Sequence, residues 1–498
     1  MDRRLRELGA VVVLGMIMSI LDTTIVVVAV DTLGRDFKTS LSSIQWVTTG
    51  YLLSLSLVIP LTRWTVERFG AKRMWMVSLT LFLAGSVLCG LAWSSASLIL
   101  FRVVQGFGGG MIMPIGMAIL AAEAGPRRIG RVMSLVGLPA LVAPVLGPVI
   151  GGLIVTHLSW RWIFYVNVPV GVVALVLAAR LLHSDDEKRV TSRLDLLGFA
   201  LISPGLAALV YSLAEAGNGG GISNPKVIVS FVIGVVLTVS FGLHAWRTQA
   251  PLLDVRLFRN RTFTVATLCS FAVGAVLFGA MFVLPLYYQV VRGQSALAAG
   301  LLMAPQGLGA MIGMPISGRI VDKSGAGRVV PIGFVIVIIG TLAYTQVGVD
   351  TNEALLAGAL FIRGIGMGFT MMPAIAAAYA TLSSDAIPRA TTMVNIVQRV
   401  GGSFGTALFA VVLQRQIVAN VPGSGGHVLS SAAVRTSDSA RQALADAFGH
   451  TFWWVVGATV VGIVPALFLP RHAATAPDEE QAKQREPVAS RAGGPDGI

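Results

Sequence analysis

Two stretches of the sequence decide the fold: residues 60–73, PLTRWTVERFGAKR, and residues 315–328, PISGRIVDKSGAGR. Their shared residues all stand at one offset of 255 positions: Pro60, Glu67, Gly70, Ala71 and Arg73 recur as Pro315, Asp322, Gly325, Ala326 and Arg328. A glycine-rich run at 106–114 is echoed at 364–373, at nearly the same offset. The chain therefore consists of two halves with the same organisation.

The composition places both halves in a membrane. Of the 498 residues, 55% are hydrophobic and 12% are charged, and the mean hydropathy is +0.78. Soluble proteins carry roughly 25% charged residues, so this chain has too little polar surface to face water on all sides. A helix needs about 20 apolar residues to cross a bilayer. Fourteen such runs stand near residues 9–33, 43–62, 74–93, 97–121, 132–156, 162–182, 195–214, 227–246, 263–288, 295–318, 329–348, 353–377, 390–414 and 449–470.

The positive charges orient these spans. With the N-terminus inside, the cytoplasmic segments hold 26 Lys and Arg residues and the external segments hold 8. Because cytoplasmic loops of membrane proteins are enriched in Lys and Arg, both termini are predicted to be cytoplasmic. No basic patch is interleaved with aromatic residues, so the net charge of +13 indicates membrane topology and not a nucleic-acid partner.

The repeat assigns the spans to domains. We predict an all-α polytopic membrane protein with an N-terminal six-helix half (1–183), two inserted helices with linkers (184–261), a C-terminal six-helix half (262–470) and a disordered cytoplasmic tail (471–498). Repeated halves of this kind build secondary transporters, whose substrate site lies between the halves near the middle of the membrane.

Asp22, in the pattern LDTTIV at 21–26, is the only acidic residue deep within an expected span. A carboxylate in a bilayer span costs about 3 kcal/mol on insertion scales, so it usually faces a cavity or a partner. Its proton affinity rises on burial and falls on exposure to water, which suits a proton carrier. The alternative is a carboxylate that is permanently paired and only holds helices together.

A second intramembrane charge, Arg102, begins the pattern RVVQGFG at 102–108. At 1.5 Å per helical residue, Arg102 lies about 8 Å and Asp22 about 13 Å below the outer boundary, so the two can interact. A nearby guanidinium favours an ionised carboxylate. The alternative is an arginine satisfied by backbone carbonyls.

Small residues and prolines crowd the fifth expected span. Glycines allow helices to approach closely, and prolines bend them, which suits a hinge that excludes water; small-residue packing alone is the alternative. The residues are Gly137, Pro139, Pro144, Gly147, Pro148, Gly151 and Gly152.

The loop at 67–73, ERFGAKR, and its partner at 318–325, GRIVDKSG, combine a glycine with charges of both signs. Glycine permits a tight turn, and a carboxylate stabilises a neighbouring helix N-terminus. Short charged loops usually mark topology alone.

These four patterns resemble those of 14-span drug:proton antiporters of the major facilitator superfamily, EmrB/QacA type, over nearly the whole chain before the tail. The resemblance implies that Asp22 and Arg102 take part in proton coupling and that the fifth span carries an antiporter motif. The sequence departs from the family pattern at Val27 and Asp31, where Asn and Pro are usual, and at Arg63 and Glu67, where Gly and Asp are usual. The resemblance also implies a cytoplasmic gate formed by Glu67, Arg68, Gly70, Arg73, Gly318, Asp322 and Gly325.

Polar and aromatic residues of other spans are candidates for a substrate cavity. Asn395, Gln398 and Arg399 fall on one helical face within an expected span. Aromatic and Met side chains accommodate varied hydrophobic ligands, although most such residues pack internally or face lipid. The candidates are Trp46, Tyr51, Tyr287, Tyr288, Met303, Gln306, Met372, Asn395, Gln398 and Arg399.

We therefore expect a monomeric multidrug exporter of the bacterial plasma membrane that exchanges small hydrophobic, cationic compounds for protons. Its expected partners are the lipid bilayer and these substrates, with the proton as coupling ion and no cofactor or metal. The sequence contains neither GxxxxGK[ST] nor HExxH, which disfavours an ATP-driven pump or a membrane enzyme. Transport of a metabolite or lipid on the same fold, and a membrane receptor that transports nothing, remain the alternatives.

Overall fold

The computed structural model describes residues 3–39, 41–124, 143, 146–147, 149–182, 194–216, 224–249, 251–382, 386–420 and 438–471. Every regular element within these ranges is a helix, and twelve helices there are long and apolar enough to cross a membrane. Of the other two expected spans, 43–62 corresponds to α2 (Leu41–Val58) and the 3-10 helix η1 (Ile59–Leu61). The span at 132–156 lies largely outside the described residues. The all-α class is confirmed, and the count of fourteen spans stays a prediction.

The local sequence explains where several of these helices begin. Asp195, Asn224, Asn260 and Asn352 each precede a helix, and their side-chain oxygens accept a hydrogen bond from a backbone N–H of its first turn. The first four N–H groups of a helix have no partner within it, so each of these contacts stabilises the helix start by about 1 kcal/mol.

Two glycines make the turns of the repeated loops. Gly70 has φ +93° and separates α3 from α4, and Gly325 has φ +76° and separates α13 from α14. Glycine adopts positive φ without a steric penalty. The repeat found in the sequence is therefore a repeat of backbone conformation.

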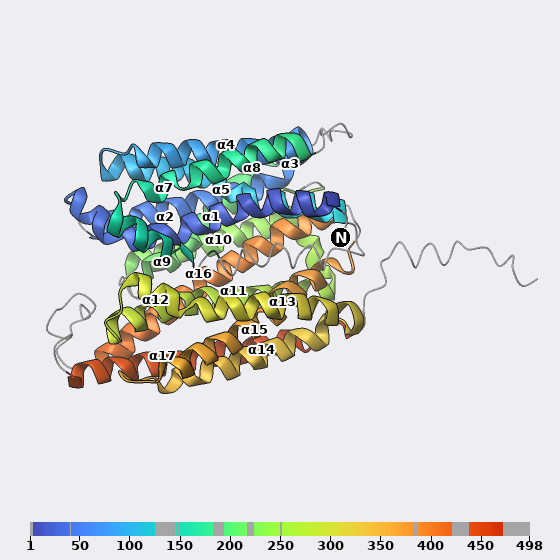
Figure 1. Ribbon diagram of the computed structural model, residues 1–498. Coiled ribbons are helices and arrows are strands. Elements are labelled where there is room, and N and C mark those ends of the chain that lie inside the picture. The colour runs from blue at the N-terminus through green and yellow to red at the C-terminus, as the bar shows by residue number, and fades with distance from the viewer. Residues whose placement is uncertain are drawn as a thin grey trace, which may run out of the picture.

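The first half is a bundle in which α5 packs against α1, α2 and α4, while α8 packs against α1 and α4. It forms the blue and teal layer of Figure 1. Besides α2 and η1, its helices are α1 (Arg3–Asp36), α3 (Thr62–Phe69), α4 (Ala71–Gly90), α5 (Ser95–Ala124), α7 (Trp162–Tyr165) and α8 (Asn167–Leu181).

The second half repeats this packing, because α15 packs against α13 and α14 as α5 packs against α2 and α4. Helix α11 is central and contacts α15, α16 and α17. The elements are η3 (Val255–Arg259), α11 (Arg261–Leu286), the π-helix η4 (Tyr287–Val291), α12 (Ala296–Leu302), α13 (Ala304–Ser324), α14 (Ala326–Leu342), η5 (Ala343–Gln346), α15 (Glu353–Tyr379), α16 (Ile387–Asn420) and α17 (Asp438–Ala466).

The inserted helices α9 (Leu196–Glu215) and α10 (Pro225–Arg247) pack against each other. Helix α9 also contacts α2 of the first half and α16 of the second. The outer surface of α10 is apolar, with about half of each valine side chain exposed at Val229, Val232, Val236 and Val239. Such a surface is stable against lipid and unfavourable in water.

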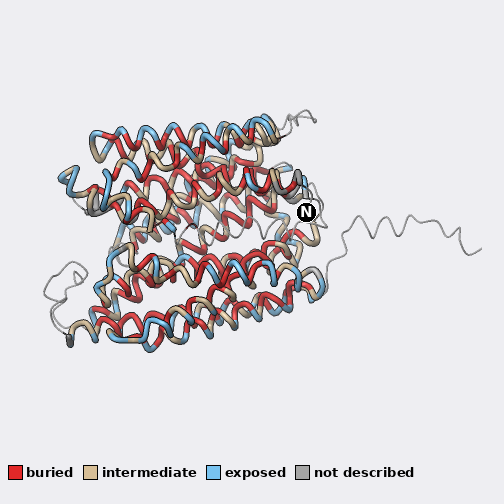
Figure 2. Tube along the Cα trace, viewed as in Figure 1, coloured by how far each residue is buried: buried red, intermediate tan, exposed pale blue. Residues whose placement is uncertain are grey.

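Among the described helices, α16 makes the principal contacts between the two halves. It belongs to the second half, yet it touches α3, η1 and α5 of the first. Figure 1 shows it between the two layers, and Figure 2 shows buried residues on the inner sides of the helices. Residues of α16 at these contacts therefore lie against both halves.

Candidate proton-coupling site

Asp22 lies within α1, and none of its surface is exposed. Its Oδ2 is 2.5 Å from Nη1 of Arg102 on α5, and that side chain is also fully buried. Leaving either charge buried without the other would be strongly unfavourable. The structure thus brings together, as one ion pair, the two residues expected to take part in proton coupling.

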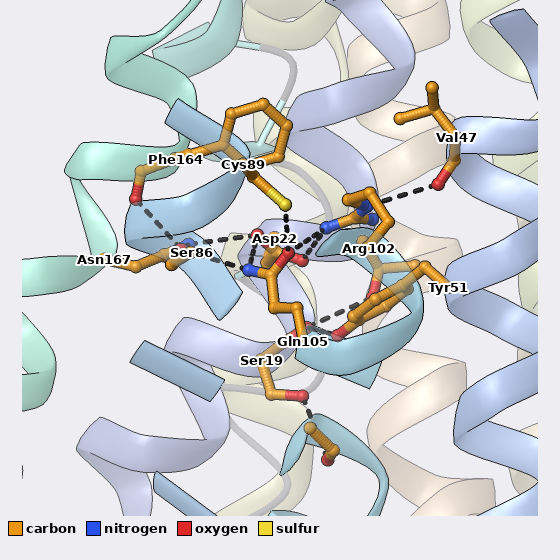
Figure 3. Close-up of polar contacts among 12 residues, drawn as sticks. Ser19, Asp22, Val47, Tyr51, Ser86, Cys89, Arg102, Gln105, Phe164 and Asn167 are labelled. Atoms are coloured by element: carbon orange, nitrogen blue, oxygen red, sulfur yellow. Dashed lines mark hydrogen bonds and ion pairs between the residues drawn. The ribbon is translucent and has the colours of Figure 1, made fainter. Parts of the chain in front are cut away.

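Two amides complete the surroundings of the carboxylate (Figure 3). Nε2 of Gln105 donates to Oδ1 of Asp22 at 2.8 Å, and Nδ2 of Asn167 donates to the same oxygen at 3.0 Å. Both amides also donate to Oγ of Ser86 on α4, at 3.0 and 2.9 Å. Hydrogen donors alone face the carboxyl group within the described residues, which is what an ionised carboxylate requires.

Arg102 is held from three further directions. Its Nε donates to the carbonyl of Val47 at 3.2 Å, and its Nη1 also donates to Oε1 of Gln105 at 2.7 Å. The ring of Tyr51 lies 3.9 Å from the guanidinium carbon, which is a cation–π contact. Nη2 has no hydrogen-bond partner in the described part of the chain. Tyr51, expected to line a cavity, therefore packs on the ion pair.

Glycines bring the helices close enough for this network. A Cβ on Gly85 of α4 would lie 2.6 Å from Cα of Gln105, so only glycine lets α4 and α5 approach at this level. A Cβ on Gly147, in the fifth expected span, would lie 2.0 Å from Oγ1 of Thr24. Thr24 is two residues after Asp22, so the fifth span packs directly on the turn that carries the carboxylate.

The other small residues of the fifth span divide into two groups. Gly151 packs on Ile25 of α1, and Gly152 faces Leu297 of α12 in the second half. This span therefore contacts both halves where it is described, and the hinge role stays a prediction. Outside the described residues lie Gly137, Pro139, Pro144 and Pro148.

The second half lacks a matching acid. The 255-residue offset relates Tyr51 to Gln306 and Asp22 to Leu277. Gln306 accepts a hydrogen bond from Arg363, and the other end of that guanidinium donates to a backbone carbonyl of α11 at 3.2 Å. Arg363 is buried, and no acidic side chain pairs with it among the described residues. Among the described residues, a fully buried pair of an acid and an arginine is found in the first half alone.

Comparison with known proteins places this arrangement in a family. The profile of the Major Facilitator Superfamily matches residues 12–406. The chain belongs to this superfamily. It is similar to a multidrug resistance protein B homolog of Mycobacterium tuberculosis, 39% identical over 496 residues that cover 95% of this chain and 92% of the relative. It is also similar to the multidrug export protein EmrB of Escherichia coli, 31% identical over 394 residues, or 78% of this chain and 77% of EmrB.

Solved structures of major facilitator proteins share the fold. The proton:xylose symporter XylE superposes with a TM-score of 0.64 at 14% identity, covering 96% of this chain and 98% of XylE. The human organic anion transporter MFSD10 superposes with a TM-score of 0.60 at 15% identity, over 92% and 100% of the two chains. With its apolar helices and bacterial relatives, this chain is a multi-pass transporter of the bacterial inner membrane.

Besides Tyr51, Arg399 is the cavity candidate that lies in electrostatic range of the ion pair's surroundings. It is partly exposed on α16, within electrostatic range of Tyr51 of the first half. It has no hydrogen bond or ion pair within the described residues. Nearby, the amide of Asn395 donates to the carbonyl of Thr391 on its own helix, and Gln398 is buried. Within the described part of the chain, Arg399 is thus a cation of α16 without an ion-pair partner, in electrostatic range of the first half.

Apart from Tyr51, the aromatic candidates do not gather around Asp22. Trp46 is 41% exposed and stacks on Tyr211 of α9, with ring centroids 5.7 Å apart. Tyr287 and Tyr288 are buried in the second half, where the hydroxyl of Tyr288 lies 2.9 Å from that of Tyr344. The remaining candidates are also buried in the second half: Met303, Gln306 and Met372. A cavity lined by these residues stays a prediction.

In the first gate loop, Glu67 pairs with Arg63 at 2.7 Å. Nζ of Lys72 donates to the carbonyls of Ala179 and Leu182, at 2.9 and 2.6 Å. A cation at the C-terminal end of a helix is stabilised by the helix dipole, so the loop is fastened to the end of α8. Two gate candidates point outward and are exposed: Arg68 and Arg73.

In the second gate loop, the turn at Gly325 is followed by a hydrogen bond from the N–H of Gly327 to the carbonyl of Pro470, at 2.9 Å. This bond ties the loop to the chain after α17. A Cβ on Gly318 would meet no atom within 4 Å, so close packing does not explain that glycine. The side chain of Asp322 lies outside what the structure describes. The gating role of both loops stays a prediction.

Sequence reasoning missed two members of the network, Ser86 and Asn167, and quoted Gln105 only as part of a pattern. A signal for Asn167 existed, because it is an amide inside the apolar run 162–182. The rule that singled out Asp22, that polar groups within a span need a partner, applies to amides as well.

Proposed function

We propose that this protein is a proton-coupled multidrug exporter that works by alternating access, with Asp22 as the proton-exchanging group. The names of its relatives, multidrug resistance protein B homolog and multidrug export protein EmrB, support drug export. The substrates we propose are small, hydrophobic and cationic, as expected from the sequence. The proton is the coupling ion, and no cofactor takes part.

The single observation that carries this proposal is the buried ion pair between Asp22 and Arg102, 2.5 Å apart with neither side chain exposed. Charges in such an environment interact strongly because the dielectric constant is low. A proton on Asp22 would remove one of the two charges, so the energy of this site depends on whether it carries a proton. Each proton that enters the cell contributes about 2.3 kcal/mol per 100 mV of membrane potential.

Tyr51 lies between the surroundings of the ion pair and those of Arg399. It packs on Arg102 with its ring 3.9 Å from the guanidinium carbon, and it is within electrostatic range of Arg399 on α16. Because α16 makes the principal contacts between the halves among the described residues, we expect a change in charge at Asp22 to influence how α16 packs on the first half. This supports coupling between protonation and the relative movement of the halves.

The test uses purified protein in proteoliposomes with an imposed pH gradient. Fluorescent lipophilic cations, neutral drugs and a panel of metabolites are offered, and uphill movement is recorded with and without the gradient. We expect the gradient to drive the lipophilic cations, and Asp22→Asn to abolish that movement. Asp350→Asn, which changes an exposed loop acid, serves as the matched control and keeps it.

Two outcomes would overturn the proposal. Uphill transport of drugs by Asp22→Asn at the wild-type rate would mean that another group carries the proton. Movement of a metabolite, with no drug transported under any gradient, would favour a metabolite transporter on the same fold.

A further inference from the structure

Asn167 differs from the other groups that hold the Asp22 carboxylate. Arg102 and Gln105 both belong to α5, whereas Asn167 is the first residue of α8. Asn167 is 4% exposed. Its amide nitrogen donates two hydrogen bonds within the site, to Asp22 at 3.0 Å and to Ser86 at 2.9 Å. One amide therefore joins α8 to α1 and α4 at the level of the carboxylate (Figure 3).

The orientation of this amide is determined by its neighbours. The hydroxyl of Ser86 donates to the carbonyl of Phe164 at 3.1 Å, so its oxygen is left to accept from Asn167. A carboxylate accepts hydrogen bonds and donates none. The NH₂ group must therefore face both Asp22 and Ser86, while the amide oxygen of Asn167 accepts no hydrogen bond from the described residues.

A protonated Asp22 does not fit these surroundings. Its new O–H needs an acceptor, yet the groups around it present hydrogens. The oxygen of Gln105 is already occupied by Arg102 at 2.7 Å, so Gln105 is held in place. The amide oxygen of Asn167, in contrast, accepts no hydrogen bond from the described residues, so it is not held in this way. Of the two amides, Asn167 is the one that can leave or turn when the proton arrives.

We infer that Asn167 is a positioning residue that holds Asp22 in its ionised form and releases α8 when Asp22 takes up a proton. This inference rests on the proposed function, because it assigns to α8 a response to the proton exchanged at Asp22. The only bond that forms is the O–H bond on Asp22, and what breaks is the hydrogen bond from Asn167.

Other groups that titrate or carry charge face the same carboxylate. They are Arg102 on α5, Tyr51 on α2 and Cys89 on α4, with Arg399 of α16 acting on Tyr51. An ordinary phenol titrates near pH 10 and a thiol near 8.5, and an arginine remains charged. With these ordinary values, the phenol, the thiol and the guanidinium keep their protons around neutral pH.

The test measures the pH at which drug transport in proteoliposomes is half-maximal. Asn167→Leu removes the amide at similar volume. A hydrogen bond to a charged group is about twice as strong as a neutral one, so the ionised form loses more than the protonated form. We expect the midpoint to move upward by about one pH unit. Asn167→Ser, whose hydroxyl is too short to reach Asp22, should move it in the same direction if the leucine variant does not fold.

The matched control is Thr459→Val. Thr459 is a buried residue of α17 whose hydroxyl donates only to the carbonyl of Val455 on its own helix. It should leave the midpoint unchanged, which separates a specific effect from the general loss of a buried polar group. A midpoint that is unchanged or lower in the Asn167 variants would overturn the inference. Failure of the proposed function is distinct, because Asp22→Asn would then retain pH-driven transport.

A second measurement follows α8 itself. In the wild type, hydrogen–deuterium exchange over 167–181, corrected for the intrinsic effect of pH, should be faster below the midpoint than above it. In Asn167→Leu the corrected rates should be equal, because α8 is already free of the carboxylate. Equal rates in the wild type would overturn the release of α8.

Discussion

Replacing Arg102 by methionine should make the stability of this transporter depend on pH. The substitution removes the donor that lies 2.5 Å from Asp22 and leaves the carboxyl group fully buried. Removing one partner of a buried ion pair costs about 3–5 kcal/mol, because the remaining charge is uncompensated. Asp22 avoids this cost by taking up a proton.

The proton uptake determines how steeply the free energy of unfolding depends on pH. The folded variant then holds one proton more than the unfolded chain at neutral pH, so its free energy of unfolding falls by about 1.4 kcal/mol for each unit of rising pH. The variant is less stable than the wild type, and between pH 5 and pH 7 this difference in the free energy of unfolding should grow by about 3 kcal/mol. At pH 7 the difference then approaches the cost of burying an ionised Asp22 without a partner.

Chemical denaturation in mixed detergent micelles at the two pH values provides the assay. In the double variant Asp22→Asn with Arg102→Met, the destabilisation should be the same at both pH values, because no carboxyl group remains at this position. Arg292→Met is the matched control: its partner Glu353 is 3.1 Å away and 49% exposed, so the loss should stay near 1 kcal/mol at both pH values. Equal destabilisation by Arg102→Met at pH 5 and pH 7 would refute the buried ion pair.

Two further substitutions test the packing and the helix starts. Gly106→Ala places a Cβ 1.8 Å from Oγ of Ser54 and 2.8 Å from a backbone oxygen, so α2 and α5 must separate; the same denaturation assay should show a loss of about 1–3 kcal/mol. Asp195→Ala removes the acceptor 2.8 Å from the N–H of Gly198 and 2.9 Å from the ring of His244. It should cost about 1–2 kcal/mol, and an unchanged thermal midpoint would show that α9 does not depend on this cap.

The backbone was predictable because its signals are local. Apolar length sets each span, and glycines with positive φ make the tight turns at Gly70 and Gly325. The span at 43–62 shows the limit of such signals. Its helix α2 has 18 residues and continues through a 3-10 turn into α3, so one apolar run spans three elements.

The ion pair was predictable, and the rest of the site was not. Two opposite charges at similar depth in a membrane must meet or be separately satisfied, so Asp22 and Arg102 could be paired from the sequence. Ser86, Asn167 and Tyr51 carry no charge, and a span tolerates a hydroxyl, an amide or a phenol at many positions. Their roles depend on which helix faces which, and that is decided by close packing at residues such as Gly85.

The two halves share their packing but differ in the chemistry of their buried residues, because packing follows from local signals and the chemistry depends on single side chains. Repeated spans and turns reproduce the packing of α2, α4 and α5 in α13, α14 and α15. They do not reproduce the chemistry, because Leu277 and Gln306 stand where the first half has Asp22 and Tyr51. Among the described residues, Arg363 is therefore satisfied by neutral acceptors, and no acidic side chain pairs with it. A proton taken up by Asp22 would thus change a buried ion pair of the first half, whereas Leu277, at the matching position of the second half, has no proton to exchange.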